Sequence, residues 1–319
     1  MPDTRLSWFI VPKCRLTPFC VLCILLAAAA DAQIKIAVNA TTIESAPIFL
    51  AERASGVQLV PVPNGRVAMA QLLSGSVDAA TGSETQMLLN SIAEPGIRIV
   101  LTLAEARYRI IARQSAGIRR IQDLRGKRVA ATVNTSSQYY LREMLRKAGM
   151  LLESDIRFVN LEGPDMPAAL KRGEVDAVAI WEPHAQNSLE ALGGDAVDLQ
   201  DPSVYRERFN LNTTTKALRD PDKRRALVEF LRAVQRASDL ARRQPAQAQT
   251  LLAPFLNTPA ATIEHVWNRF TFPASLPGDL PTVLGNVEIF VAAVQFRQPR
   301  PKAALTGLID SSLLTASKK

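Results

Sequence analysis

The sequence predicts an α/β protein built from two similar lobes that face a common cleft. From Gln33 onwards, short runs rich in β-branched residues alternate with longer helical patterns, which is typical of layered α/β structures with largely parallel strands. One ten-residue motif occurs twice, beginning at Ala70 and at Ala168. The length of 319 residues is in keeping with about two domains.

The first 32 residues have the pattern of a secretory signal peptide. A basic N-terminal region precedes an apolar stretch, Leu16–Ala30, and Ala30-Asp31-Ala32 is a small-x-small cleavage site. The apolar stretch is shorter than the roughly 20 residues that a transmembrane helix needs. We therefore expect cleavage after Ala32 and a soluble product outside the cytoplasm.

All three cysteines lie in this leader, at Cys14, Cys20 and Cys23. Large residues stand directly before Cys20 and Cys23, whereas a lipoprotein signal has small residues there, so no lipid anchor is expected. The part of the chain after Ala32 contains no cysteine, and its stability must come from its core rather than from disulfides.

The composition excludes several classes of protein. With 47% hydrophobic and 21% charged residues, the chain is too apolar to be disordered. The net charge of +8 comes from basic residues that are scattered among acidic ones, and no basic run predicts a nucleic-acid surface. We take the charge as a weak indication of an anionic partner and expect no nucleic acid.

The first lobe is expected to begin with a strand directly after the leader. A loop then leads to a helix with Pro47 at its first position, where a residue without an N–H is favoured. The strands expected here cover 34–38, 57–62, 77–81 and 97–102, and a helix covers 66–73.

The repeated motif, A-x-L-x-x-G-x-V-D-A, describes the same local structure in both copies. It predicts the end of a helix, a glycine cap in the left-handed conformation and a buried strand entered through aspartate. Glu84 and Glu182 each lie nine positions after the motif glycine. The repeat therefore indicates two similar lobes whose strand ends meet at one cleft.

The second lobe is expected to begin with a strand over 108–113. A strand over 127–133 enters an amphipathic helix that has Tyr140, Leu141 and Met144 on its apolar face and stops at Gly149. A further strand covers 156–161. After 209–215 the pattern is helical, with helices expected over 221–243, 245–252, 258–270 and 280–296.

Two motifs of this lobe carry a resemblance to a known family. D-L-R-G-K-R-V begins at Asp123, T-S-S-Q-Y-Y-L begins at Thr135, and the second repeat runs on into A-I-W-E-P, which ends at Pro183. These residues are similar to the periplasmic substrate-binding proteins of ABC importers for nitrate, sulfonates and taurine. The resemblance extends over nearly all of residues 33–275.

The resemblance implies a type II periplasmic binding fold, in which two α/β lobes joined by two crossing strands close on a ligand. The crossings would lie near 108–112 and 209–215, with lobe 1 formed by 33–107 and 216–319 and lobe 2 by 108–215. The sequence departs from the family in two places. A segment after the first helix is shortened to Ala54-Ser55-Gly56, and Ser83-Glu84 stands where many members have small residues or proline.

Polar residues at strand ends are the candidates for ligand binding. Asn134–Ser137 lies at a strand-to-helix junction, where free backbone N–H groups and the helix dipole attract an anion, although the same residues also make an ordinary N-cap. Thr41 and Thr42 follow the first strand. The full set of candidates is Thr41, Thr42, Ser83, Glu84, Asn134, Thr135, Ser136, Ser137, Trp181 and Glu182.

The two glutamates leave the charge of the ligand open. If Glu84 or Glu182 points into the cleft unpaired, it repels an anion, and the ligand would then carry an amino or amidine group beside its acidic end. Alternatively, both carboxylates pair with arginine or cap a helix. Trp181 either stacks on an organic ligand or belongs to the core.

Catalysis and metal binding are not expected. The only histidines, His184 and His265, are far apart in the sequence, and no nucleophile elbow, phosphate loop or dinucleotide fingerprint occurs. We therefore expect no metal and no cofactor. The prediction is a monomeric solute receptor that delivers a small anionic or zwitterionic compound to a membrane permease. The alternatives are a binder of a pyrimidine or thiamine precursor or of an aromatic acid, and an enzyme on the same fold.

Overall fold

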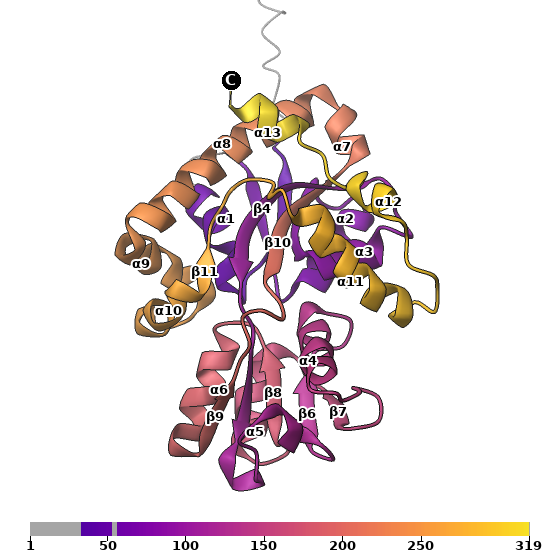
Figure 1. Cartoon of the computed structure of the whole chain (residues 1–319). Coiled ribbons are helices and arrows are strands. Elements are labelled where there is room, and N and C mark those ends of the chain that lie inside the picture. The colour runs from indigo at the N-terminus through magenta and orange to yellow at the C-terminus, as the bar shows by residue number, and fades with distance from the viewer. Residues whose placement is uncertain (1–32, 53–55, 319) are drawn as a thin grey trace, which may run out of the picture. The chain divides into compact units, whose positions relative to one another are not determined.

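The computed structural model describes residues 33–52 and 56–318, and the chain within these ranges forms two sheets flanked by helices (Figure 1). The predicted leader, residues 1–32, lies outside the described residues, as do Ala54 and Ser55 of the shortened segment. Within the described ranges, none of the helices has an apolar run that would let it span a bilayer.

The first sheet has six strands in the order β11-β4-β10-β3-β1-β2. Strands β1, β2 and β3 are parallel, and β10 runs antiparallel between β3 and β4. The strands are β1 Lys35–Asn39, β2 Gln58–Val62, β3 Ala79–Ser83, β4 Ile97–Ala106, β10 Glu207–Thr214 and β11 Phe270–Thr271.

The second sheet has five strands in the order β7-β6-β8-β5-β9. Strands β6, β7 and β8 are parallel, and β5 is antiparallel to both of its neighbours. The strands are β5 Arg109–Arg113, β6 Arg128–Ala131, β7 Arg157–Asn160, β8 Ala177–Ile180 and β9 Ala196–Leu199.

The chain crosses between the sheets twice. The first crossing is Arg107-Tyr108, which joins β4 to β5, and the second is the segment 200–206, which joins β9 to β10. The first overlaps the expected crossing at 108–112, whereas most of the expected crossing at 209–215 lies within β10. Strand β10 pairs within the six-stranded sheet, although the predicted second lobe, 108–215, includes it. The lobe boundaries stay a prediction.

Helices cover both faces of each sheet. One face of the six-stranded sheet packs against α1, α8, α9, α10 and α13, and the other face against α2, α3, α11 and α12 (Figure 1). In the second sheet, α4 and α6 flank the central strands. The helices are α1 Ala46–Ala51, α2 Gly65–Leu73, α3 Glu84–Asn90, α4 Ser136–Lys147, α5 Met166–Lys171, α6 His184–Leu192, α7 Thr215–Arg219, α8 Pro221–Arg243, α9 Pro245–Leu256, α10 Ala260–Val266, α11 Leu280–Val294, α12 Lys302–Thr306 and α13 Ser312–Ser317.

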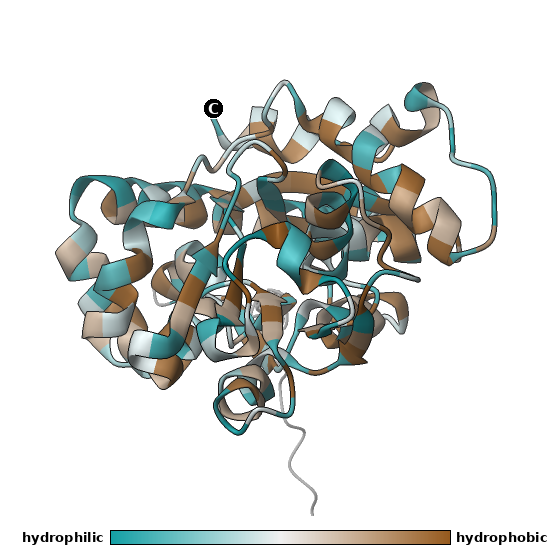
Figure 2. Ribbon diagram, turned by 60° about the horizontal axis from the view of Figure 1, so that its bottom comes forward, coloured by the Kyte–Doolittle hydropathy of each residue, from teal (hydrophilic) through white to brown (hydrophobic). Residues whose placement is uncertain are grey.

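Helix α8 illustrates why these segments are helical. Its buried residues recur three or four positions apart, as at Leu227, Phe230, Leu231 and Val234, which makes one continuous apolar face. Hydrophobic residues gather where the helices meet the sheets, and hydrophilic residues cover the outer sides of the helices (Figure 2).

Both copies of the repeated motif adopt the predicted helix end. Gly75 and Gly173 have φ angles of +73° and +71°, which favour glycine because a Cβ atom would be strained there. In each copy the next residue donates a backbone hydrogen bond into the last turn of the helix, from Ser76 to Gln71 at 3.1 Å and from Glu174 to Ala169 at 3.0 Å. The predicted left-handed glycine caps are confirmed.

The motif aspartates also have equivalent roles. Asp78 Oδ2 accepts a hydrogen bond from the backbone N–H of Lys35, and Asp176 Oδ2 accepts one from that of Arg128, both at 2.9 Å. Each aspartate therefore fastens its own strand to the start of the neighbouring parallel strand. The expected strand over 77–81 was placed too early, because Asp78 acts in the turn and β3 begins at Ala79.

Candidate ligand-binding site

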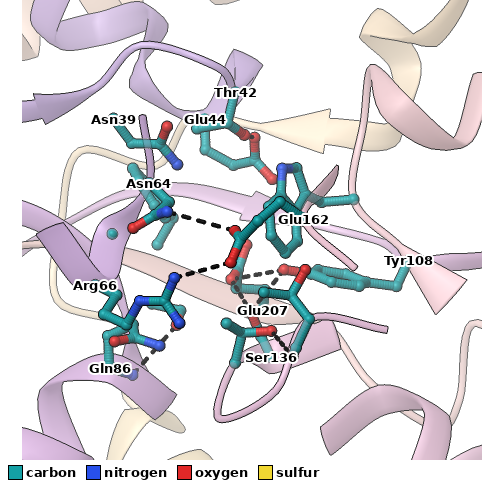
Figure 3. Close-up of a pocket in the computed structure, with 16 residues that line it drawn as sticks. Asn39, Thr42, Glu44, Asn64, Arg66, Gln86, Tyr108, Ser136, Glu162 and Glu207 are labelled. Atoms are coloured by element: carbon teal, nitrogen blue, oxygen red, sulfur yellow. Dashed lines mark hydrogen bonds and ion pairs between the residues drawn. The ribbon is translucent and has the colours of Figure 1, made fainter. Parts of the chain in front are cut away.

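A pocket lies between the two sheets, near the two crossings. Its empty space of about 450 Å³ includes space that is open to solvent. Its walls come from both sheets (Figure 3). The lining residues are Asn39, Thr42, Glu44, Asn64, Gly65, Arg66, Ser83, Gln86, Tyr108, Thr132, Thr135, Ser136, Glu162, Trp181, Glu207 and Phe209.

Glu207, the first residue of β10, is the polar centre of the pocket. Its Oε1 lies 2.9 Å from the hydroxyl of Tyr108 and 2.9 Å from that of Ser136, and these two hydroxyls are 2.7 Å apart. Figure 3 shows Tyr108 and Ser136 turned toward this carboxyl group. Glu207 is thus held by the first crossing and by the first turn of α4.

Glu44 lies beside Glu207 and comes from the loop after β1. The hydroxyl of Thr42 donates to its Oε2, and Glu44 and Glu207 both line the pocket. Burial and the neighbouring carboxylate raise the pKa of Glu44 well above its usual range, and burial raises that of Glu207 to about 7. Both shifts favour the protonated form of these carboxyl groups.

Glu84 is buried but is not among the lining residues. Its Oε1 accepts a hydrogen bond from the Tyr205 hydroxyl at 2.5 Å, and its Oε2 accepts one from the backbone N–H of Arg208 at 3.0 Å. Burial, followed by the charge of Glu207, raises the pKa of Glu84 to about 8. The structure places this candidate behind the pocket, against the second crossing.

Glu182 is also buried outside the pocket lining, but it has a cationic partner. Its Oε1 lies 2.5 Å from Nη2 of Arg109, and both side chains are almost completely inaccessible to solvent. The backbone N–H of Gln186 donates to Glu182 Oε2 at 2.9 Å, and Arg269 lies 3.6 Å away. The alternative in which this carboxylate pairs with arginine and caps a helix is therefore the one observed.

The junction before α4 places two of its four candidates in the pocket wall. Thr135 caps the helix by accepting from the backbone N–H of Ser137 at 3.2 Å, and Ser136 lies next to Glu207. The hydroxyl of Ser137 instead donates to the carbonyl of Ala179 at 2.6 Å, which joins α4 to β8. Asn134 has a φ of +58° and directs its carbonyl to Gln86 Nε2, 2.7 Å away.

Of the remaining candidates, three line the pocket and one does not. Thr42, Ser83 and Trp181 line the pocket, and Ser83 also caps α3. Thr41 does not line it, because its hydroxyl donates to Asn39 Oδ1 at 3.0 Å. The indole Nε1 of Trp181 is buried and has no acceptor among the described residues.

The rim of the pocket carries an ion pair that joins the two sheets. Arg66 of α2 lies 2.8 Å from Glu162, which follows β7, and Asn64 Nδ2 lies 3.5 Å from the same carboxylate. Both charged side chains are substantially exposed. Figure 3 shows Arg66 and Asn64 reaching toward Glu162 from the opposite wall.

Sequence reasoning missed more than half of the polar wall, including Thr132. Glu44 stands two positions after Thr42, and this proximity was the only local signal that could have added it to the candidates. Tyr108 and Glu207 lie in the crossings, where neither periodicity nor spacing marks a side chain as pocket-facing. Asn39, Asn64, Arg66, Gln86 and Glu162 were also not predicted.

No group suited to a metal ion is present in the described residues, since nowhere do three histidine, cysteine, aspartate or glutamate side chains converge in that way. His184 is buried beside Trp181, with ring centroids 6.2 Å apart. Burial lowers its pKa to about 4, so the imidazole is neutral at physiological pH.

Residues 49–248 match the sequence model of a family described as NMT1/THI5 like. The match covers more than half of the chain. This protein belongs to the NMT1/THI5-like family. The resemblance inferred from the two motifs is thereby confirmed. A protein of Escherichia coli (strain K12) that is named for aliphatic sulfonate binding is 27% identical over 244 residues, which are 76% of this chain and 72% of that relative.

Solved structures show the same fold. The periplasmic aliphatic sulphonate binding protein SsuA from Escherichia coli has a TM-score of 0.69 at 21% identity, covering 85% of this chain and 91% of that one. The periplasmic nitrate-binding protein NrtA from Synechocystis PCC 6803 has a TM-score of 0.74 at 13% identity, covering 89% and 88%. The predicted fold class, a type II periplasmic binding fold, is confirmed.

Proposed function

We propose that this protein is the solute-binding component of an ABC importer, which captures a small anionic or zwitterionic organic compound and delivers it to a membrane permease. The observation that carries the proposal is a pocket whose walls come from both sheets of a family member with the periplasmic binding fold. Relatives named for sulfonate and nitrate binding support the choice of solute class.

Closure of the cleft is the proposed mechanism. A solute between the sheets contacts both walls only when they approach each other, so its binding energy shifts the equilibrium toward the closed form. Two contacts between the walls support this account, namely the ion pair of Arg66 with Glu162 and the hydrogen bond from Gln86 to Asn134. We place the solute against Thr42, Ser83, Thr135, Ser136 and Trp181, the predicted residues that line the pocket.

We also propose that the protein acts in the periplasm without catalysis, as a monomer, after removal of a leader at Ala32. Relatives described as periplasmic binding proteins support both the location and the absence of catalysis. Mass spectrometry of the protein recovered from the periplasm of an expression host tests the cleavage, and Gln33 should be its first residue.

A solute screen tests the function. Thermal unfolding should be measured with sulfonates, nitrate, amino acids, aromatic acids and pyrimidines, because a solute at 100 times its dissociation constant adds about 2.7 kcal/mol of stability. Small-angle scattering with the tightest solute should then show compaction, with a non-binding compound from the same screen as the control. Tight binding without compaction contradicts the closure mechanism.

Replacement of Ser136 by alanine tests the placement of the solute. The variant should bind the solute more weakly by about 1 to 3 kcal/mol, because one hydroxyl is lost from the wall and the hydrogen bonding of Glu207 changes. Titration calorimetry measures the difference. Ser115→Ala, on the exposed surface, is the matched control, and equal affinities of the two variants contradict the placement.

A further inference from the structure

The lining of the pocket contains more acidic than basic side chains. Three of the lining residues are acidic, Glu44, Glu162 and Glu207, and Arg66 is the only lining residue that is basic. Arg66 is already paired with Glu162 at the exposed rim. The inner end of the pocket therefore carries the charge of the Glu44–Glu207 pair without a balancing cation from the lining.

The rest of the protein does not balance this charge either. None of the ion pairs formed by the residues that the structure describes includes Glu44 or Glu207, whose side chains are 1% and 2% exposed. Hydrogen bonds from Thr42, Tyr108 and Ser136 stabilise the carboxyl oxygens but carry no positive charge. A buried charge without a counter-charge is costly, and a cation is the group that would remove the cost.

A second observation points to an acceptor group on the ligand. Trp181 lines the same pocket and is 8% exposed, and its Nε1–H finds no acceptor among the described residues. An indole N–H is a donor only, so an ammonium group cannot satisfy it. It needs an acceptor oxygen, and the guanidinium of Arg66 at the rim offers further donors for the same group.

We propose that the pocket binds a zwitterion whose protonated amine or amidine lies against Glu44 and Glu207 and whose acidic end takes the hydrogen bond of Trp181 and faces Arg66. The inference rests on the proposed function and narrows its solute class. Simple anions that lack such a group are excluded from the inner end, because nothing there neutralises them.

Matched pairs of compounds test the inference directly. In each pair, one compound has an amine where the other has a hydroxyl group. The pairs are taurine and isethionate, β-alanine and 3-hydroxypropanoate, and 4-aminobutyrate and 4-hydroxybutyrate. The amine of at least one pair should bind at least tenfold more tightly than its hydroxyl partner in titration calorimetry. Equal or tighter binding of the hydroxyl partner, or binding of simple anions while no amine binds, overturns the inference.

Variants identify the residues responsible. The double variant Glu44→Gln, Glu207→Gln should lose the preference for the amine, whereas Glu153→Gln, an exposed carboxyl that does not line the pocket, should keep it. If the double variant does not fold, Trp181→Phe provides the second test. It should weaken binding of the amine compound several-fold while keeping the preference over the hydroxyl partner, and unchanged affinity contradicts the role of the indole.

The outcomes separate this inference from the proposed function. Binding of alkanesulfonates or nitrate with cleft closure, but without amine preference, overturns the zwitterion and leaves the solute receptor intact. If no compound binds, either in the matched pairs or in the wider solute screen, the zwitterion inference and the proposed function are both overturned.

Discussion

Glutamate side chains are buried in two regions of this protein. In one region cations lie beside the carboxylate, and in the other they do not. Glu182 is surrounded by cations, with Arg109 at 2.5 Å and Arg269 at 3.6 Å, and it also caps α6. Glu44 and Glu207 accept hydrogen bonds from the hydroxyl groups of Thr42, Tyr108 and Ser136, and none of the ion pairs of the described residues includes them. The first region lies outside the pocket lining, and the second forms its inner end.

The comparison shows that burial alone does not distinguish a carboxylate with a structural role from one that binds a ligand. In the Glu182 region the arginines and the α6 N–H offset the cost of desolvation, so the site is complete within the chain. In the Glu44–Glu207 region, hydroxyl groups contact the carboxyl oxygens and no ion pair formed by the described residues balances them. The difference lies in the partner, and we infer that the missing partner of the second region is the cationic end of the solute.

The largest expected effect comes from removing charge in the two regions by the same chemical change. Glu182→Gln leaves the buried guanidinium of Arg109 with only part of its countercharge, and we expect a loss of about 3 kcal/mol in the free energy of unfolding. Glu44→Gln should leave stability unchanged or raise it, because an amide reproduces the donor and acceptor of the protonated carboxyl. Urea unfolding at pH 7 measures the free energy of unfolding of both variants. An equal loss in the two would contradict the difference inferred between the two regions.

The pH dependence of stability should come from the carboxyl groups that have no cation. Burial raises the pKa of Glu207 to about 7 and that of Glu84 to about 8, so the folded state holds protons that the unfolded state has lost. Their stabilising contribution is complete below the unfolded pKa near 4.5 and is lost as the pH rises through 7 and 8. We expect the free energy of unfolding to fall between pH 6.5 and 8, by up to about 1.4 kcal/mol per pH unit for each group.

His184 does not disturb this pH window. Its pKa is lowered to about 4, so its own effect on stability lies below the unfolded value near 6.5 and has the opposite sign. Urea unfolding curves at several pH values check the trend, and the Glu84→Gln variant should flatten it. A wild-type stability that rises between pH 6.5 and 8 would contradict the assignment of protons to these carboxyl groups.

The smallest effect is expected at the rim. Arg66→Ala breaks an ion pair whose side chains are 49% and 39% exposed, and exposed pairs contribute about 0 to 1 kcal/mol. The variant should therefore unfold almost like the wild type, while its affinity for the acidic end of a solute falls. A stability loss above about 2 kcal/mol would show that the rim pair holds the two sheets together on its own.

Much of the fold could be predicted from the sequence because its signals are local. The glycines of the repeat mark left-handed caps, and the apolar face of α8 is periodic over the whole helix, whose bounds agree with the predicted 221–243. Strand β10 was harder to assign, because its partners β3 and β4 lie more than 100 residues earlier in the chain. Long-range pairing decides to which sheet such a strand belongs.

The pocket could be predicted only in part. Thr42, Ser83, Thr135, Ser136 and Trp181 follow strands or begin helices, and these positions led to their prediction. Glu44 and Glu207 were missed because their meeting depends on how a loop after β1 packs against the second crossing. Glu84 and Glu182 were predicted from the repeat. They occupy equivalent positions after the two repeated motifs, but neither lines the pocket.

One crystallographic measurement tests the central claim most directly, and it can be made before the solute is identified. Crystals of the wild-type protein should be soaked separately in rubidium, which resembles ammonium in size and charge, and in bromide. Anomalous difference maps should show rubidium beside the carboxyl groups of Glu44 and Glu207 and no bromide at that position. Bromide at the inner end of the pocket, or its carboxyl groups without any rubidium, would contradict a cation site.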